Sequence, residues 1–173
     1  MSNDSSPVTL YDTTLRDGTQ MEGISLSVDD KLRIAERLDQ LGVHFIEGGW
    51  PGSNPKDEEF FRRVKELKLE HASIVAFGST RHAKTTVEKD ANLKALIESG
   101  APVVTLVGKA SEMQVTEVLE TSQEENLAMI TESIEYLRKQ GLRVLFDAEH
   151  FFDGYAENPE YSLACVRAAA EAG

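Results

Sequence analysis

The amino-acid sequence predicts an α/β fold built on a parallel sheet, and three observations support this. Five apolar runs rich in β-branched residues recur along the chain, beginning near Val8, His44, Ser73, Val103 and Arg143. A helical segment follows each run. The starts of successive runs are roughly 30 to 40 residues apart, which is the length of one strand–helix unit. Strands that alternate with helices in this way lie parallel in one sheet.

The segments between the runs have recognisable helix starts. Ser27, Asn54-Pro55 and Asn158-Pro159 are typical N-terminal caps, and Ser122 opens the capping sequence Ser-Gln-Glu-Glu. Glycines are the expected helix stops, at Gly42, Gly100, Gly141 and Gly173. The expected buried faces are Ile34, Leu38 and Leu41; Phe60, Val64 and Leu67; Leu93, Leu96 and Ile97; and Leu127, Ile130, Ile134 and Leu137.

Residues 8–173 are expected to supply about the first five βα units of a TIM (β/α)8 barrel. Five units cannot close a barrel, and Gly173 falls where a sixth strand is expected, so we interpret the sequence as the front part of a longer chain that is cut before strand 6. The alternative is a complete five-stranded doubly wound domain. Residues 1–7, MSNDSSP, are predicted to be a disordered tail, because they lack the charged and apolar regions of a signal peptide.

Composition excludes several classes of partner. Thirty acidic against 18 basic residues give a net charge of −12, which argues against non-specific binding to nucleic acid. No apolar stretch approaches the ~20 residues of a membrane-spanning helix. Cys165 is the single cysteine and cannot form an internal disulfide, which is typical of a reducing cytoplasm. We therefore predict a cytoplasmic protein without nucleic-acid or membrane partners.

The segment TLRDGTQ, residues 14–20, has two interpretations. Asp17-Gly18 between alternating apolar residues is a strong hairpin signal. A hairpin needs a second strand directly afterwards, for which only MEGISLS is available before the next helix. The alternation of strands and helices favours the other interpretation, in which TLRDGTQ is the loop after the first strand. In parallel α/β sheets such loops carry the functional site.

Polar residues lie at the C-terminal end of every expected strand. Asp12, Thr14 and Arg16 alternate along the first run and so share one face, while Glu47 lies within an apolar run between Ile46 and a pair of glycines. The later strands end in Arg81, Lys109, Asp147 and Glu149. Tyr11 is expected to be a packing residue.

Each of these charges also has a structural interpretation. Glu47 could pair with Arg16, Arg81 and Lys109 could be surface charges, and the carboxylates of the fifth strand could form a solvated loop edge. Charges at strand ends are costly unless they are paired, metal-bound or catalytic. Together, one cation and three or four carboxylates at the C-terminal ends of neighbouring strands predict an oxygen-rich site for a divalent metal ion.

The stretch DTTLRDGTQ, residues 12–20, resembles the signature of the α-isopropylmalate, homocitrate and citramalate synthases. These belong to the DRE-TIM metallolyases, TIM-barrel metal enzymes that also include the 3-hydroxy-3-methylglutaryl-CoA lyases. The resemblance continues through FIEGGWPGSNPKDEEFF, AFGSTRHA, VTLVGKAS, TSQEENLAMI and FDAEHFFDGY, and so covers essentially the whole chain from Val8. GGWPGSNPKD, GSTR and DAEHFFDGY are most similar to the citramalate synthase branch. The resemblance implies a pyruvate carboxyltransferase-type catalytic barrel.

The resemblance also implies roles for particular residues. Arg16 matches the arginine that polarises the keto oxygen of the substrate, and Asp17 matches a carboxylate ligand of the divalent metal. Gln20 matches a polar residue near the bound 2-oxo acid, and Glu47 matches an acidic residue that organises this centre. Glu149 matches a glutamate of the fifth strand that orients substrate or transfers a proton.

The implied reaction is a Claisen-type condensation of acetyl-CoA with pyruvate, followed by thioester hydrolysis to citramalate and CoA. It implies acetyl-CoA as co-substrate, a Mg²⁺, Mn²⁺ or Zn²⁺ ion, a role in isoleucine biosynthesis, and a homodimer at full length. Arg81, Lys84 and Lys109 are candidates to bind the CoA phosphates. The alternatives are a 2-isopropylmalate synthase, as in leucine biosynthesis, a homocitrate synthase, or an inactive fragment or interaction module.

One part of the family pattern is missing. The family completes its metal site with a His-x-His pair on a later strand, and the four histidines of this sequence contain no such pair. The pair is expected beyond Gly173, so this chain is expected to carry only part of the metal site.

Overall fold

The computed structural model describes residues 8–173, so the predicted tail 1–7 lies outside the described residues. The strands are β1 (Tyr11–Asp12), β2 (Phe45–Gly49), β3 (Ser73–Ser79), β4 (Val103–Lys109) and β5 (Arg143–Glu149). The helices are α1 (Val28–Gln40), α2 (Pro55–Val64), α3 (Ala91–Ser99), α4 (Gln123–Lys139), α5 (Phe151–Glu157) and α6 (Pro159–Ala172). A 3-10 turn (Gly18–Gln20) follows β1, and a π-helical turn (Gln114–Val118) follows β4.

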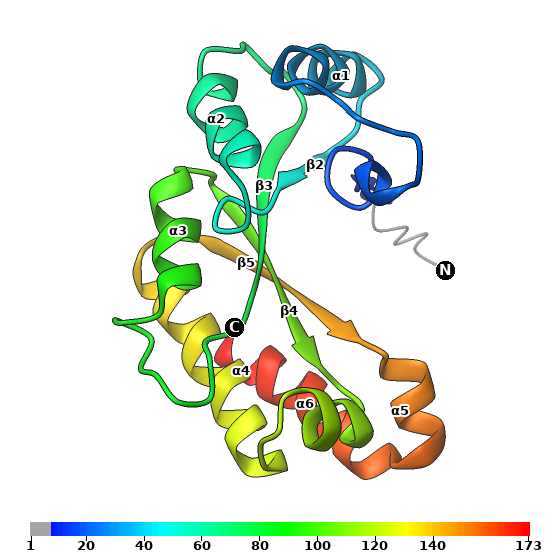
Figure 1. The fold of residues 1–173 in the computed structure, drawn as a ribbon, viewed down its shortest axis with the longest axis vertical. Helices are drawn as coiled ribbons and strands as arrows, with labels where there is room; N and C mark the ends of the chain where they lie inside the picture. The colour runs from blue at the N-terminus through cyan, green and yellow to red at the C-terminus, as the bar shows by residue number, and fades with distance from the viewer. Residues whose placement is uncertain (1–7) are drawn as a thin grey trace, which may run out of the picture.

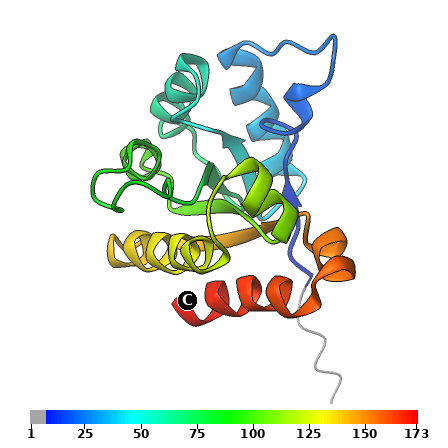
Figure 2. The ribbon, with the colours of Figure 1, turned by 60° about the horizontal axis from the view of Figure 1, so that its bottom comes forward.

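The five strands form one parallel sheet in the order β1-β2-β3-β4-β5. Each strand pairs with the next along the chain, so right-handed crossovers place successive helices on the same face. Helices α1, α2, α3, α4 and α6 accordingly follow one another as an arc along the outside of a curved sheet, from blue to red, while α5 lies past the end of β5 (Figures 1 and 2). A doubly wound sheet would reverse its strand order. That alternative is wrong, and the chain forms about five βα units of a TIM barrel.

The first strand is much shorter than predicted. The Asp12 carboxylate accepts hydrogen bonds from the backbone N–H and the hydroxyl of Thr14, both at 3.0 Å, and this local turn ends β1. Asp12, Thr14 and Arg16 therefore do not share one strand face, because residues 14–17 form turns and residues 18–20 form the 3-10 turn. Asp17 precedes the 3-10 turn, and β1 pairs in parallel with β2. The hairpin interpretation is therefore wrong.

The predicted helix starts are confirmed. Ser27 accepts a hydrogen bond from the backbone N–H of Asp30, and its own backbone N–H donates to the Asp30 carboxylate, which completes a capping box. Asn54, Ser122 and Asn158 each accept the backbone N–H three residues further on.

Two details of the helices differ from the prediction. The deeply buried face of α1 consists of Lys31, Ala35 and Asp39, while Leu41 is exposed at the end of the helix. Helix α5 was not predicted at all. It begins directly after β5, where His150 adopts a left-handed backbone conformation with φ of 58°.

The hydrophobic core has two parts because side chains alternate across the sheet. The larger part lies between sheet and helices and includes Ile46, Phe60, Leu96, Leu106 and Ile130. The smaller part lies on the opposite, concave face, where Phe45, Val75 and Val103 pack with Tyr11 and Leu145. Among residues 8–173, no helix combines the length and the apolar character needed to cross a bilayer.

Candidate functional site at the carboxyl ends of the strands

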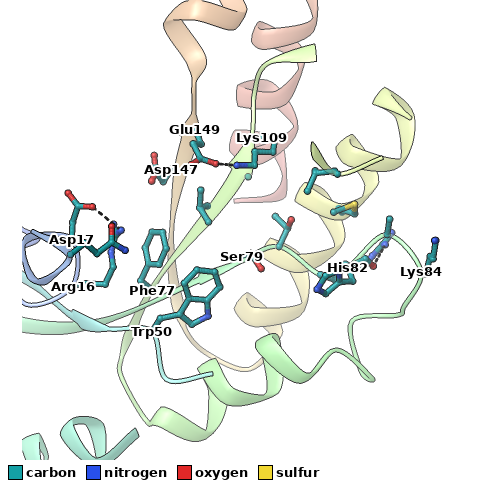
Figure 3. A pocket seen from close by; sticks show the side chains of 18 residues that line it. Arg16, Asp17, Trp50, Phe77, Ser79, His82, Lys84, Lys109, Asp147 and Glu149 are labelled. Carbon is teal, nitrogen blue, oxygen red and sulfur yellow. Dashed lines mark hydrogen bonds and ion pairs between the residues drawn. The ribbon is translucent and has the colours of Figure 1, made fainter. Parts of the chain in front are cut away.

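A cavity of about 720 Å³ lies at the carboxyl ends of the strands. All but one of the residues to which the resemblance gives a role line it: Arg16, Asp17, Gln20, Arg81, Lys84, Lys109 and Glu149. The exception, Glu47, is buried beside it. In Figure 3 the cavity extends from Arg16 and Asp17 at one end to His82 and Lys84 at the other, with Trp50 and Phe77 between them. Residues far apart in the sequence thus meet because parallel strands end at one edge.

Arg16 is held by three contacts. Its Nε atom donates a hydrogen bond to Oε1 of Glu47 at 2.5 Å, and its guanidinium carbon lies 3.8 Å from the centre of the Phe77 ring. Its Nη1 atom lies 3.3 Å from Oδ1 of Asp17. A guanidinium with an ionic partner and an aromatic face beneath it is both charged and oriented.

Glu47 is a buried carboxylate with partners on both oxygens. Oε1 accepts from Arg16, and Oε2 accepts from the hydroxyl of Tyr11 at 2.5 Å. The Tyr11 oxygen also lies 2.7 Å from Oγ1 of Thr105 on β4. Burial and the hydrogen bond to Glu47 raise the pKa of the Tyr11 phenol above its usual value. Tyr11 is therefore more than the packing residue that was expected.

Asp17 and Gln20 lie on the turn after β1. The side chain of Asp17 is 60% exposed and faces the cavity mouth beside Arg16. Residues 8–173 contain no group of three or more His, Cys, Asp or Glu side chains arranged to hold a metal ion. The described residues therefore do not fit a complete metal site, and the metal role of Asp17 stays a prediction.

Lys109 and Glu149 close the β4–β5 side of the cavity as an ion pair (Figure 3). Their strands pair in register at these two residues. Asp147 lines the same wall, and burial followed by the charge of Glu149 raises the pKa of its carboxyl group. Two carboxylates and one ammonium group thus lie within one part of the cavity.

Arg81 lies at the cavity wall but is held by carboxylates of α4. Its Nη1 and Nε atoms contact Glu125 and Glu132, each at 2.7 Å, and its side chain is 6% exposed. Burial alone would lower the pKa of Arg81, and the two carboxylates outweigh it and raise that pKa. Binding of substrate by Arg81 stays a prediction.

Trp50 is a cavity residue that the sequence did not single out. Its indole packs edge-on against Phe77, with ring centres 5.5 Å apart, and its Nε1 atom donates to Oδ1 of Asn92 at 2.8 Å. Its backbone N–H donates to Asp57 at 2.9 Å. The signal in the sequence was its place in GGWPG at the end of the second strand.

The sheet is curved and parallel, and it gathers arginine, lysine and carboxylates around one cavity at its carboxyl edge. This is the arrangement of (β/α)-barrel enzymes, whose active sites lie at that edge. Comparison with known proteins narrows this class. The chain belongs to the HMGL-like family, which matches residues 7–173. The predicted family resemblance is confirmed.

Among relatives, the (R)-citramalate synthase of Synechocystis sp. is 57% identical over 173 residues, which is 100% of this chain and 32% of that protein. The (R)-citramalate synthase of Aquifex aeolicus is 53% identical over 96% of this chain and 31% of its own length. A probable 2-isopropylmalate synthase of Methanosarcina mazei is more distant, at 34% over 98% of this chain and 30% of that protein. The chain thus spans about a third of the length of these relatives.

Solved structures support the fold. The hydroxymethylglutaryl-CoA lyase from Pseudomonas aeruginosa superposes with a TM-score of 0.73 at 23% identity, covering 96% of this chain and 55% of that chain.

Proposed function

We propose that the chain is part of the catalytic barrel of a condensing enzyme that joins acetyl-CoA to pyruvate and releases citramalate and CoA. The observation that carries the proposal is the placement of Arg16. Its guanidinium lies in the cavity, fixed by Glu47 and Phe77, in a chain 53–57% identical to (R)-citramalate synthases along nearly its whole length. Arginine suits this place because it stays protonated beside carboxylates.

In the proposed reaction, negative charge develops on the keto oxygen of pyruvate as the new carbon–carbon bond forms. The guanidinium of Arg16 stabilises that charge, and Glu47 keeps the guanidinium in place. Gln20 contacts the oxo acid from the turn after β1. Glu149, paired with Lys109 at the opposite wall, orients the acetyl group or transfers its proton.

The acetyl-CoA phosphates need cations in an acidic protein, and the far end of the cavity offers them. Lys84 lines that end beside His82 (Figure 3). Arg81, Lys84 and Lys109 remain the proposed contacts, with Lys84 the one whose charge has no ion-pair partner among the described residues.

The proposal includes a divalent metal ion, Mg²⁺, Mn²⁺ or Zn²⁺, which would polarise the oxo acid when bound. Asp17 is the one ligand that we assign to it. Because residues 8–173 do not complete a metal site, we assign no catalytic step to the ion. We further propose that the full-length protein works in the cytoplasm as a homodimer, in isoleucine biosynthesis.

A 2-isopropylmalate or homocitrate synthase is the alternative within the same reaction class. We propose pyruvate as the acceptor because the chain is 53–57% identical to (R)-citramalate synthases and 34% identical to a probable 2-isopropylmalate synthase. A non-catalytic interaction module is the alternative from another class.

Thiol release from acetyl-CoA tests the proposal. The full-length protein is assayed with pyruvate, 2-oxoisovalerate or 2-oxoglutarate, with Mn²⁺ or Mg²⁺ and after removal of metal by a chelator. We expect release with pyruvate that depends on the metal. Release with a different acceptor alone would assign one of the related synthases, and no release with any acceptor would contradict a condensing enzyme.

A further inference from the structure

The Tyr11 hydroxyl contacts Glu47, and the Thr105 hydroxyl contacts Tyr11, while neither residue lines the cavity. Tyr11 comes from β1 and Thr105 from β4, and the two meet on the concave face of the sheet. We propose that Tyr11 and Thr105 are positioning residues that hold Arg16 in its working orientation through Glu47. This inference rests on the proposed function.

The number of available protons fixes the direction of the chain of hydrogen bonds. The Tyr11 hydroxyl has one proton, and the carboxylate oxygen Oε2 of Glu47, 2.5 Å away, can only accept it. The contact of 2.7 Å between the two hydroxyl oxygens must then use the Thr105 proton. Thr105 therefore donates to Tyr11, and Tyr11 donates to Glu47.

Glu47 consequently has each oxygen fixed by a different element. Tyr11 holds Oε2 from β1, and Arg16 holds Oε1 from the turn that follows. Glu47 is 1% exposed, and among the described residues the Tyr11 hydroxyl is the donor to its Oε2 atom. Loss of that hydroxyl leaves a buried carboxylate oxygen without a donor, and the carboxylate must turn or shift to find one.

A shift of Glu47 is transmitted to the cavity because the contact to Arg16 is through Nε. With Nε bound to Glu47, Nη1 lying 3.3 Å from Oδ1 of Asp17 and one face of the guanidinium on Phe77, Nη2 and the second N–H of Nη1 are the donors left for the cavity. Their direction is set by the plane of the Glu47 carboxylate. Misplacing such a group by about 1 Å costs on the order of 10²-fold in rate.

The test uses the full-length enzyme with three single variants and the double variant Tyr11→Phe/Thr105→Val. Tyr11→Phe removes the hydroxyl alone, Thr105→Val removes the donor behind it, and Thr105→Ser restores that donor. Tyr161→Phe is the matched control, since Tyr161 is also buried and its hydroxyl accepts a hydrogen bond from Asn126, on the helix side of β4. Turnover with pyruvate is measured together with the KM for acetyl-CoA, well below the melting temperature of each variant.

We expect kcat of Tyr11→Phe to fall about tenfold or more, with a KM for acetyl-CoA within about twofold of wild type. The kcat of Thr105→Val should fall less, about threefold, and that of Thr105→Ser should be close to wild type. The double variant should match Tyr11→Phe alone, because Thr105 acts only through the Tyr11 oxygen. Tyr161→Phe should keep wild-type kcat.

Wild-type kcat in Tyr11→Phe would overturn the inference. An equal loss of kcat in Tyr161→Phe would overturn it too, and so would a double variant whose loss of kcat is the product of the two single losses. If the wild-type enzyme itself releases no thiol with any acceptor, the proposed function fails. A crystal structure of Tyr11→Phe then decides the inference by itself. A displaced Glu47 carboxylate and Arg16 guanidinium would support it, and unmoved side chains would overturn it.

Discussion

Nε of Arg16 lies 2.5 Å from Oε1 of Glu47, so two residues 31 positions apart form the buried charge pair beside the cavity. The parallel pairing of β1 with β2 brings them together. The side chain of Glu47 is 2% exposed and that of Arg16 is 17% exposed. The pair therefore presents its cationic end to the cavity and keeps its carboxylate inside.

Glu47→Gln should separate the charge of this pair from its shape. The amide keeps the size of the carboxylate but loses its charge, so the guanidinium of Arg16 is no longer held by an ionic partner. We expect kcat with pyruvate to fall about tenfold or more. Asp153→Asn, on the exposed face of α5, is the control, and an equal effect in both variants would contradict a specific role for Glu47.

Lys31 and Asp57 form a second buried pair, which joins α1 to α2. Nζ of Lys31 lies 2.5 Å from Oδ1 of Asp57, and burial lowers the pKa of Lys31. Lys31→Met should lower the free energy of unfolding by about 3 kcal/mol, because it leaves a carboxylate without its buried cation.

Urea denaturation measures this loss. The exposed pair Lys94–Glu98, with a separation of 3.7 Å, supplies the control. Lys94→Met should change the unfolding free energy by less than about 0.5 kcal/mol. Similar losses for the two lysine variants would show that burial of the Lys31 pair has no special effect.

Gly78 is required for the packing behind Trp50. A Cβ atom at position 78 would lie 2.8 Å from Oδ1 of Asn92 and 2.8 Å from a methyl carbon of Leu96. Gly78→Ala should therefore displace Asn92 from the indole and cost about 1–3 kcal/mol of stability. Trp50 is the single tryptophan of this chain, so its fluorescence reports the change.

Asn92→Ala gives the comparison, since it removes the partner of the indole without adding volume. Both variants should shift the tryptophan emission, and Gly78→Ala should be the less stable of the two. Unchanged emission in both would contradict the hydrogen bond from Trp50 to Asn92.

The carboxyl group of Asp147 should make stability depend on pH. Its folded-state pKa is raised above the usual 3.8, first by burial and then by Glu149. The folded state therefore favours the protonated carboxyl group of Asp147. Its contribution to the free energy of unfolding is lost as pH rises through the raised pKa and the group ionises. Asp147→Asn should melt at a higher temperature than wild type at pH 7, and the difference should disappear as pH falls to about 4.

Asp30 should show the opposite sign. Hydrogen bonds from the side chain and backbone of Ser27 lower the pKa of Asp30 from 3.8. Its stabilisation is present above pH 4 or thereabouts and is lost as pH falls through the lowered pKa. Asp30→Asn should therefore melt below wild type at pH 7. Melting temperatures measured from pH 3 to pH 8 check both signs. If Asp147→Asn and Asp30→Asn both melted above wild type at pH 7, or both below it, these assignments would be contradicted.

The sequence predicted those parts of the fold that depend on local patterns. The strands β2 to β5 are apolar runs whose bounds follow from composition, and Ser27 and Asn54 cap helices through contacts three residues away. Arg16 and Asp17 could be placed at the site because they follow a strand of a parallel sheet.

Contacts between distant residues could not be predicted in the same way. Tyr11 contacts Thr105, 94 positions away, and such a pair has no local pattern. Arg81 was assigned from its charge and its place at the end of the third strand, while its contacts to Glu125 and Glu132 depend on the packing of α4. Helix α5 has only seven residues and no clear apolar period, so its sequence gave no sufficient signal.

The turnover of Arg16→Ala in the full-length protein tests the proposed role of Arg16 most directly. Thiol release from acetyl-CoA with pyruvate is measured for wild type and variant at saturating substrate. Loss of one preorganised donor should lower kcat at least ~10²-fold. A variant that keeps wild-type turnover would contradict the assignment of charge stabilisation to Arg16.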